Sequence, residues 1–182
     1  MMRIGCVVMA AGNSRRFGGN KLLADWQGRP LAAWALDAVP AGTAAVVVSQ
    51  YPAVLEMARQ RGFAAVENDR PEEGVSRTIR LGLEALSESD GALFLVADQP
   101  RLRRETVEAA IRLWQDHPDQ IVQVTAGGRR GNPCLFPARF FPELLALTGD
   151  VGGSRVIRRH PESVLGLETA AEELEDMDLP WA

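Results

Sequence analysis

The sequence predicts a three-layer α/β fold in which helices cover both faces of a twisted, mostly parallel sheet. Three observations lead to this prediction. Short runs rich in valine and isoleucine recur along the chain, helical stretches with one apolar face separate them, and the two kinds of segment alternate regularly. In an open sheet of this kind, ligands bind at the carboxyl ends of the strands. Candidate site residues are therefore sought where each apolar run ends.

The expected strands are short and apolar, and each is followed by a polar or glycine-containing segment. They span residues 3–9, 43–49, 64–66, 92–97, 121–125 and 134–136.

The expected helices occupy the intervals between these strands. Pro30 suits the first turn of the first helix, and Ile79, Leu83 and Leu86 share one face of a later helix. The helices span residues 30–39, 54–61, 76–86, 106–114, 139–147 and 154–159. The acidic tail, residues 168–178, is less regular, and most of its charge is expected to be solvated.

Composition fits one globular domain spanning residues 1–182, because 46% of the side chains are hydrophobic and 24% are charged. The formal net charge of −4 argues against partners such as nucleic acid or an anionic membrane, which need a surplus of Lys and Arg. Cys6 and Cys134 lie in different expected strands without a CxxC pair, so both are interpreted as core thiols. The first apolar run is too short for a signal peptide, so a cytoplasmic location is expected.

The segment after the first strand has the composition of a phosphate-binding loop. It runs Ala10-Ala11-Gly12-Asn13-Ser14-Arg15-Arg16-Phe17-Gly18-Gly19-Asn20-Lys21. Small residues let a triphosphate approach the backbone, glycines permit the turns, and three cationic side chains neutralise phosphate charge. The loop is not a P-loop, because Lys21 lies outside a GxxxxGK[ST] motif. The alternative is a flexible, solvated turn without a ligand.

These residues resemble the first loop of the molybdenum cofactor nucleotidyltransferases, the MobA-like NTP transferases, which reads roughly LAAGxSxRxGxxK. Four further segments resemble family motifs in the same order along the chain. They are Gly74-Val75-Ser76-Arg77-Thr78, Val96-Ala97-Asp98-Gln99-Pro100, Arg130-Gly131-Asn132-Pro133-Cys134-Leu135-Phe136 and Leu147-Thr148-Gly149-Asp150-Val151-Gly152-Gly153-Ser154-Arg155. The resemblance spans most of the chain and implies a Rossmann-like nucleotidyltransferase fold.

The first loop is more similar to the cytidylyltransferase branch, because it has Ala-Ala-Gly where the guanylyltransferase branch tends to have a second glycine. The resemblance implies transfer of CMP from CTP, favoured over GTP, to the terminal phosphate of molybdopterin or its molybdenum form, with release of pyrophosphate. A molybdoenzyme or its chaperone is a further implied partner.

Nucleotidyl transfer requires in-line positioning of the reactants and cations against the phosphate oxygens. Asp98 follows the apolar run at residues 93–97, where a carboxylate can hold a Mg²⁺ ion that bridges the triphosphate. The alternative is that Asp98 caps the next helix. Lys21 is expected beside the phosphates, and Arg15 and Arg16 are expected to bind the outer phosphates. The alternative for one of these two arginines is a surface position without a phosphate contact.

Base recognition is assigned to residues 10–12 of the first loop and to residues 68–76, because both segments should reach the same crevice at the strand ends. Ser76 begins an expected helix, which it can cap, and a helix start also offers backbone amides to an anion. The predicted nucleotide-binding residues are Ala10, Ala11, Gly12, Asn13, Ser14, Arg15, Arg16, Gly18, Lys21, Asn68 and Ser76.

Near the C-terminus, Asp176-Met177-Asp178-Leu179-Pro180 resembles a family DxDTP element, so Asp178 is a candidate second metal ligand. Here the sequence departs from the family, because Leu179 replaces the usual threonine. Asn132 stands where histidine is common, and Val75 where methionine is common.

Two other functions are compatible with these residues. A related enzyme could transfer the nucleotide to a sugar phosphate or an alcohol phosphate. A catalytically silent chaperone could keep the fold to bind or insert a molybdenum cofactor, although the presence of Lys21 and Asp98 argues against it.

Overall fold

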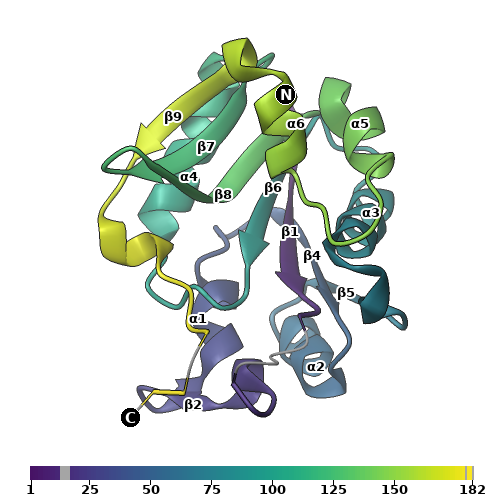
Figure 1. The fold of residues 1–182 in the computed structure, drawn as a ribbon, viewed down its shortest axis with the longest axis vertical. Coiled ribbons are helices and arrows are strands. Elements are labelled where there is room, and N and C mark those ends of the chain that lie inside the picture. The colour runs from purple at the N-terminus through teal and green to yellow at the C-terminus, as the bar shows by residue number, and fades with distance from the viewer. Residues whose placement is uncertain (13–16, 179, 182) are drawn as a thin grey trace.

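The fold is a twisted sheet with helices on both faces, as predicted (Figure 1). A computed structural model describes residues 1–12, 17–178 and 180–181. Within these residues, seven strands form the main sheet in the order β5-β4-β1-β6-β8-β7-β9. They are β1 (Ile4–Ala10), β4 (Ala44–Ser49), β5 (Ala64–Glu67), β6 (Gly91–Val96), β7 (Ile121–Ala126), β8 (Arg129–Pro137) and β9 (Val164–Glu168).

One strand of the seven, β8, runs opposite to the others. Strands β5, β4, β1 and β6 run parallel, whereas β8 is antiparallel to both β6 and β7. The start of β8 at Arg129 therefore lies on the same side of the sheet as the carboxyl ends of β1 and β6. This reversal brings the Arg130–Asn132 segment to the edge where the strand-end loops meet.

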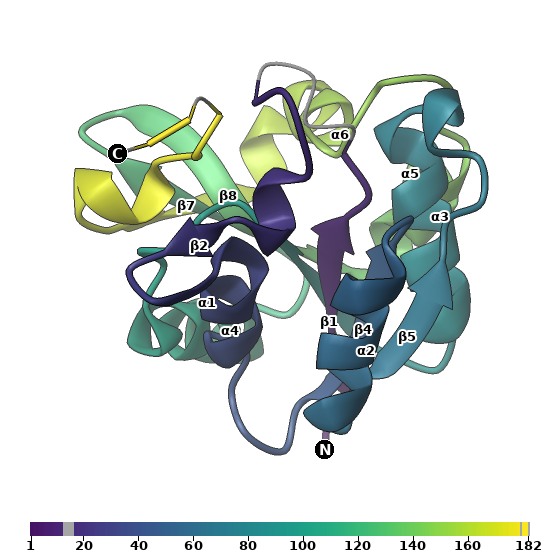
Figure 2. The same cartoon turned by 90° about the horizontal axis from the view of Figure 1, so that it is seen from below.

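Helices form two layers, one on each face (Figure 2). Helices α1 (Leu31–Asp37), α2 (Pro52–Gln60) and α4 (Arg104–Asp116) pack on one face, over the side chains of Cys6, Val8 and Leu95. Helices α3 (Val75–Ala85), α5 (Phe141–Leu145) and α6 (Ser154–Arg159) pack on the other, over Val7 and Phe136. Within the described ranges, every helix is too short or too polar to cross a lipid bilayer.

Three parts of the structure differ from the expected elements. The expected helix at 139–147 is a 3₁₀ turn, Ala138–Phe140, followed by the short helix α5, since Pro142 has no N–H to continue the first turn. Strand β8 is longer than expected, because its polar first half pairs with β7 despite its weak apolar signal. Strand β9 and the ribbon of β2 (Asp25–Trp26) and β3 (Arg29–Pro30) were not predicted.

Both cysteines are buried, as predicted, in β1 and β8. Burial raises the pKa of each thiol to about 12. At that pKa both thiols stay protonated near neutral pH, which fits their interpretation as core residues.

Candidate active site

The first loop leaves β1, an interior strand of the sheet, and is held by the residues that join β4 to α2. The Ser49 hydroxyl donates to the Ala10 carbonyl at 2.7 Å, the Gln50 amide to the Ala11 carbonyl at 2.8 Å, and the Tyr51 hydroxyl to the Gly12 carbonyl at 2.8 Å. The beginning of the loop is thus fixed by three side chains that are consecutive in sequence. Asn13, Ser14, Arg15 and Arg16 lie outside the described residues.

Lys21 lies at the end of this loop and is the only lysine in the sequence. It begins a 3₁₀ turn, Lys21–Leu23, in which the Asn20 side chain accepts the Leu22 N–H at 3.1 Å. The Lys21 Nζ lies 2.8 Å from Asp98 Oδ2 and 3.0 Å from Asp178 Oδ1. The structure therefore brings together three residues predicted for the site from three distant segments.

Two opposing effects act on the ammonium of Lys21. Its partial burial lowers the pKa, but the hydrogen bonds and charges of Asp98 and Asp178 outweigh burial and raise the pKa above its ordinary value. Lys21 is therefore charged at any physiological pH, and its charge is shared between the two carboxylates.

Asp98 follows β6 by two residues, and it does not cap the next helix, because α4 begins at Arg104 with Arg103 in the N-cap position. Its backbone carbonyl accepts the N–H of Met177 at 3.0 Å. The C-terminal tail is thereby joined to the turn that carries Asp98. The structure thus decides against the capping alternative for Asp98.

Glu173 anchors this tail to the body of the domain and was not predicted as a structural or site residue. It is only 1% exposed, and its carboxylate accepts the backbone N–H of Arg103 at 2.8 Å and the hydroxyl of Thr106 at 2.8 and 2.9 Å. The Thr169 hydroxyl is a further donor. The expectation that the tail is mostly solvated is therefore wrong at this position, because these donors satisfy a buried carboxylate.

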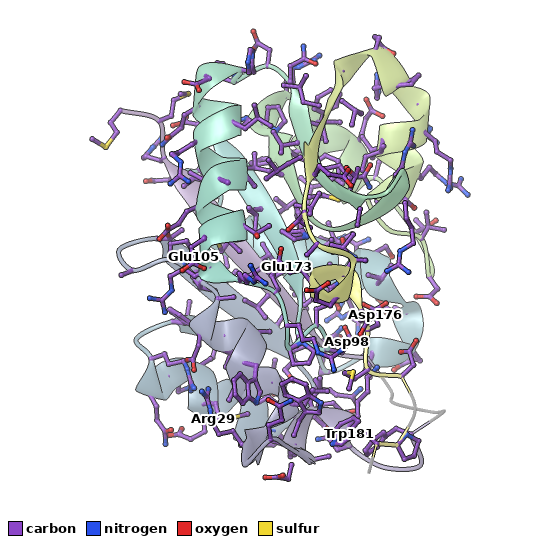
Figure 3. All side chains as sticks on the ribbon, turned by 90° about the vertical axis from the view of Figure 1, so that its left-hand side faces the viewer. Arg29, Asp98, Glu105, Glu173, Asp176 and Trp181 are labelled. Atoms are coloured by element: carbon purple, nitrogen blue, oxygen red, sulfur yellow. The ribbon has the colours of Figure 1, made fainter. Side chains whose placement is uncertain are left out.

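The tail brings a third carboxyl group to the site. Figure 3 shows Asp176 beside Asp98, with Glu173 close by on the same segment. Burial and the charges of Asp98 and Asp178 raise the pKa of Asp176 to about 6, although Lys21 and a hydrogen bond from Gln99 act in the opposite direction. The site thus concentrates negative charge around one lysine.

A cavity of about 610 Å³ opens beside these residues, at the carboxyl ends of β1 and β6. The predicted residues that line it belong to the first loop and to the turn after β6: Ala10, Ala11, Gly12, Lys21 and Asp98. The wall opposite the loop contains Pro71, Glu72, Gly74 and Val75 of the predicted segment 68–76, and also Thr78 and Asp150, which were not predicted to bind nucleotide. The volume of this cavity is within the range of small-molecule binding sites.

The start of α3 does not offer free amides to an anion. The helix begins at Val75 with Gly74 as N-cap, so Ser76 does not cap it. The Val75 N–H donates to Asp150 Oδ1 at 3.1 Å, and the Ser76 N–H donates to the Gly149 carbonyl at 3.3 Å. Gly74 has a φ of 90°, and a Cβ there would lie 2.5 Å from the Asp150 nitrogen. Close packing of this loop therefore requires glycine.

Asn68 and Ser76 are buried and do not line the cavity. The Asn68 amide donates to the Thr78 hydroxyl at 3.2 Å, and its oxygen accepts Arg77 Nε at 3.1 Å. Asn68 therefore positions Thr78, which does line the cavity. Gly18 follows the undescribed part of the loop with a φ of 77° and does not line the cavity either. Nucleotide binding by Asn68, Ser76 and Gly18 stays a prediction.

Comparison with known proteins gives relatives among nucleotide-handling enzymes. The chain is 32% identical over 124 residues to a probable molybdenum cofactor guanylyltransferase of Bacillus licheniformis, covering 66% of this chain and 62% of that protein. It is 29% identical over 141 residues to a probable molybdenum cofactor guanylyltransferase of Bacillus subtilis, covering 76% of this chain and 69% of that protein. The alignment thus spans less than two thirds of the first relative.

Solved structures share the whole fold. A crystal structure of a Mycobacterium tuberculosis H37Rv protein has a TM-score of 0.81 at 24% identity and covers 98% of this chain and 94% of that one. A second crystal structure of the same protein, in complex with manganese, has a TM-score of 0.75 at 20% identity, with coverage of 93% and 90%. These likenesses establish the architecture of the chain.

The profile of one protein family covers residues 6–164, which include the first loop, the Asp98 turn, the Arg130–Asn132 segment and the loop at Asp150. That profile describes the MobA-like NTP transferase domain. The chain therefore belongs to the family of MobA-like NTP transferase domains.

Proposed function

We propose that this chain is a nucleotidyltransferase that moves a nucleoside monophosphate from a nucleoside triphosphate to the phosphate of molybdopterin or its molybdenum form. The observation that carries the proposal is the grouping of Lys21, Asp98 and Asp178, of which Lys21 and Asp98 line the strand-end cavity. Family membership and the two Bacillus relatives support the same chemistry.

In this reaction an oxygen of the acceptor phosphate forms a bond to the α-phosphorus of the triphosphate. The bond from that phosphorus to the oxygen bridging the α- and β-phosphates breaks, and its electron pair leaves with pyrophosphate. Lys21 is placed to offset the charge that gathers on the phosphate oxygens. Arg15 and Arg16 are proposed to hold the two phosphates that leave.

The carboxylates of Asp98 and Asp178 fit a Mg²⁺ ion. Both direct an oxygen toward a common cation, at present the Lys21 ammonium. Across the described ranges, no cluster of three or more His, Cys, Asp or Glu side chains is arranged as a metal site. A Mg²⁺ held by two carboxylates completes its shell with water and phosphate oxygens, which is its usual mode in proteins.

Bound there, Mg²⁺ would neutralise charge on the triphosphate and orient its phosphates. The manganese complex of the M. tuberculosis protein supports a divalent cation in this fold. Lys21 then has a second role, because its ammonium keeps the two carboxylates together when no metal is bound. With Mg²⁺ bound, the two carboxylates would face a doubly charged ion in place of the singly charged ammonium.

Donor selection rests on two indications that differ. The Ala10-Ala11-Gly12 sequence favours CTP by resemblance to the cytidylyltransferase branch, whereas both Bacillus relatives are named guanylyltransferases, which supports GTP as the alternative donor. The proposal for the chain is CTP as the preferred donor, with GTP as the competing one.

The test is pyrophosphate release by the purified chain with Mg²⁺, CTP or GTP, and molybdopterin present or omitted. Release that requires both Mg²⁺ and the pterin, together with a dinucleotide product, supports the proposal. A chain that binds the finished dinucleotide cofactor but releases no pyrophosphate with either nucleotide contradicts it and supports a silent chaperone. Turnover that occurs only with sugar or alcohol phosphates contradicts the pterin acceptor but keeps the nucleotidyltransferase chemistry.

The control variants separate chemistry from folding. Asp98→Asn and Lys21→Ala are expected to lose most of their turnover while keeping the cooperative thermal unfolding of a folded domain. Asp116→Asn, an exposed substitution at the end of α4, is the matched control and is expected to keep full turnover.

A further inference from the structure

A second cavity, of about 340 Å³, lies between the sheet and helix α6 and is separate from the residues of the Lys21 site. Its walls come from the face of the sheet that α3, α5 and α6 cover, and they are mostly apolar. Phe94, Phe136 and Ile157 are among the buried side chains that line it. A mostly apolar pocket of this size suits a ring system.

Three polar side chains converge on this apolar cavity. Gln123 is 6% exposed, lines the cavity and lies opposite Cys134 in the β7–β8 register. Arg130 at the start of β8 and Arg158 on α6 line it from exposed positions. Within the described part of the chain, neither guanidinium has a hydrogen-bonding or ion-pair partner. Two unpaired cations beside an apolar cavity favour a ligand with a neutral ring and an anionic substituent.

The cavity adjoins the proposed reaction site on two sides, where it shares lining residues with neighbouring hollows. Met9, near the end of β1, lines both this cavity and the 610 Å³ cavity that holds Lys21. Arg130, Gly131 and Asn132 line this cavity and also a third hollow, shared with Gln99 and Asp178. A phosphate held at Arg130 is therefore placed between the ring cavity and the carboxylates at Lys21.

We propose that the cavity under α6 binds the heterocycle of the acceptor, with Gln123 on the ring and Arg130 and Arg158 on its phosphomonoester. The inference rests on the proposed function, since it assigns the second substrate of the same reaction to a place in the chain. The ring lies under α6, and its phosphate points along β8 toward the site at Lys21. The nucleotide and the acceptor then occupy separate cavities that meet at Met9.

Helix α6 provides a matched pair of variants. Arg158 lines the cavity, whereas Arg155, three residues earlier on the same helix, is exposed and does not. Arg158→Gln removes one proposed phosphate contact, and Arg155→Gln removes the same charge from the protein without touching the cavity. Ser154→Trp places a large ring at the exposed rim of the cavity, where it should block entry of the acceptor ring.

Two measurements are made on each variant. The first is direct binding of a pterin that carries a phosphomonoester side chain, followed by pterin fluorescence without nucleotide. The second is the KM for molybdopterin and, separately, the KM for the nucleoside triphosphate. Arg158→Gln is expected to weaken probe binding and raise the acceptor KM about tenfold, because charge-assisted hydrogen bonds are lost. Ser154→Trp is expected to have a larger effect, and Arg155→Gln none.

The outcomes separate this inference from the proposed function. Turnover with an unchanged acceptor KM and unchanged probe binding in both Arg158→Gln and Ser154→Trp overturns the ring site and leaves the nucleotidyltransferase intact. Probe binding that depends on Arg158, in a chain that releases no pyrophosphate, supports the ring site while the proposed function fails. If Arg155→Gln weakens probe binding as much as Arg158→Gln does, the assignment of Arg158 to the acceptor is also overturned, because the effect would then follow the net charge of the protein.

Discussion

The backbone N–H of Met177 donates to the carbonyl of Asp98 at 3.0 Å, so the C-terminal tail is fastened to the turn that follows β6. One residue further on, Asp178 reaches Lys21 across 157 positions of sequence. Upstream, the Gln99 amide donates to the Leu174 carbonyl at 3.0 Å, and Glu173 is buried against α4. The tail is therefore a structural part of the candidate site.

Replacing Glu173 is expected to destabilise the domain through its buried donors. Glu173→Ala leaves the Arg103 N–H and the Thr106 hydroxyl without their acceptor, at a cost of about 1–3 kcal/mol for each buried group left unpaired. Urea unfolding monitored by circular dichroism measures the change. Glu172→Ala, an exposed neighbour, is the control and is expected within about 0.5 kcal/mol of the parent. A parent-like midpoint for Glu173→Ala contradicts the anchoring role.

Removing either member of the Lys21–Asp98 pair is expected to reduce kcat by about 10²–10³-fold, the range for loss of one preorganised charge-stabilising group. The KM for the triphosphate is expected to change less than kcat, because the ammonium acts most strongly on charge that develops during transfer. Steady-state pyrophosphate release measures both constants. Near-normal kcat in Lys21→Ala or Asp98→Asn would exclude the assigned role.

The single lysine allows its charge to be followed directly. In a chain labelled with ¹³C at lysine Cε, one signal reports Lys21, and its titration is expected above the ordinary value of 10.5. Asp98→Asn should lower the pKa more than Asp178→Asn, since the Asp98 contact is shorter and makes the larger contribution. Addition of Mg²⁺ with the triphosphate should shift the signal as the carboxylates exchange cations. A signal insensitive to both substitutions contradicts the observed pairing.

Asp37, which lies away from the candidate active site, is expected to make the stability of the domain depend on pH. Burial acts to raise the pKa of its carboxyl, but hydrogen bonds and charges from Arg61 and Arg29 outweigh burial and lower the pKa. A lowered folded-state pKa stabilises the domain above the unfolded-state value of about 3.9, and this stabilisation is lost as pH falls through the folded-state pKa. Asp37→Asn is therefore expected to be less stable than the parent at pH 7.

The parent and Asp37→Asn should converge in stability at a pH below both the folded-state and the unfolded-state pKa of Asp37. Thermal unfolding from pH 7 down to the acid limit of reversible folding measures the trend. A difference between parent and Asp37→Asn that stays constant with pH would show that the charge of Asp37 contributes nothing.

Local patterns in the sequence were sufficient for most elements of the fold. Apolar runs specified β1, β4, β6 and β7 to within a few residues, because strand burial on both faces leaves a continuous apolar segment. The edge strand β5, which has no fully buried residue, was specified by its short run of alanine and valine. Helix α6 was predicted with its bounds, Ser154–Arg159. Strand β8 was predicted only at its apolar end, because its polar half is specified by pairing with β7, a contact that local pattern does not encode.

For the site, the sequence by itself determined the kinds of group present: a small-residue loop ending in a lysine, and an aspartate directly after a buried strand. Only the tertiary structure decided that Asp178 pairs with Lys21, that Glu173 is buried, and that Asp150 accepts the backbone N–H at the start of α3. The reason is physical. Strand ends are encoded by local burial, whereas contacts between distant segments depend on strand order and on the reversed direction of β8.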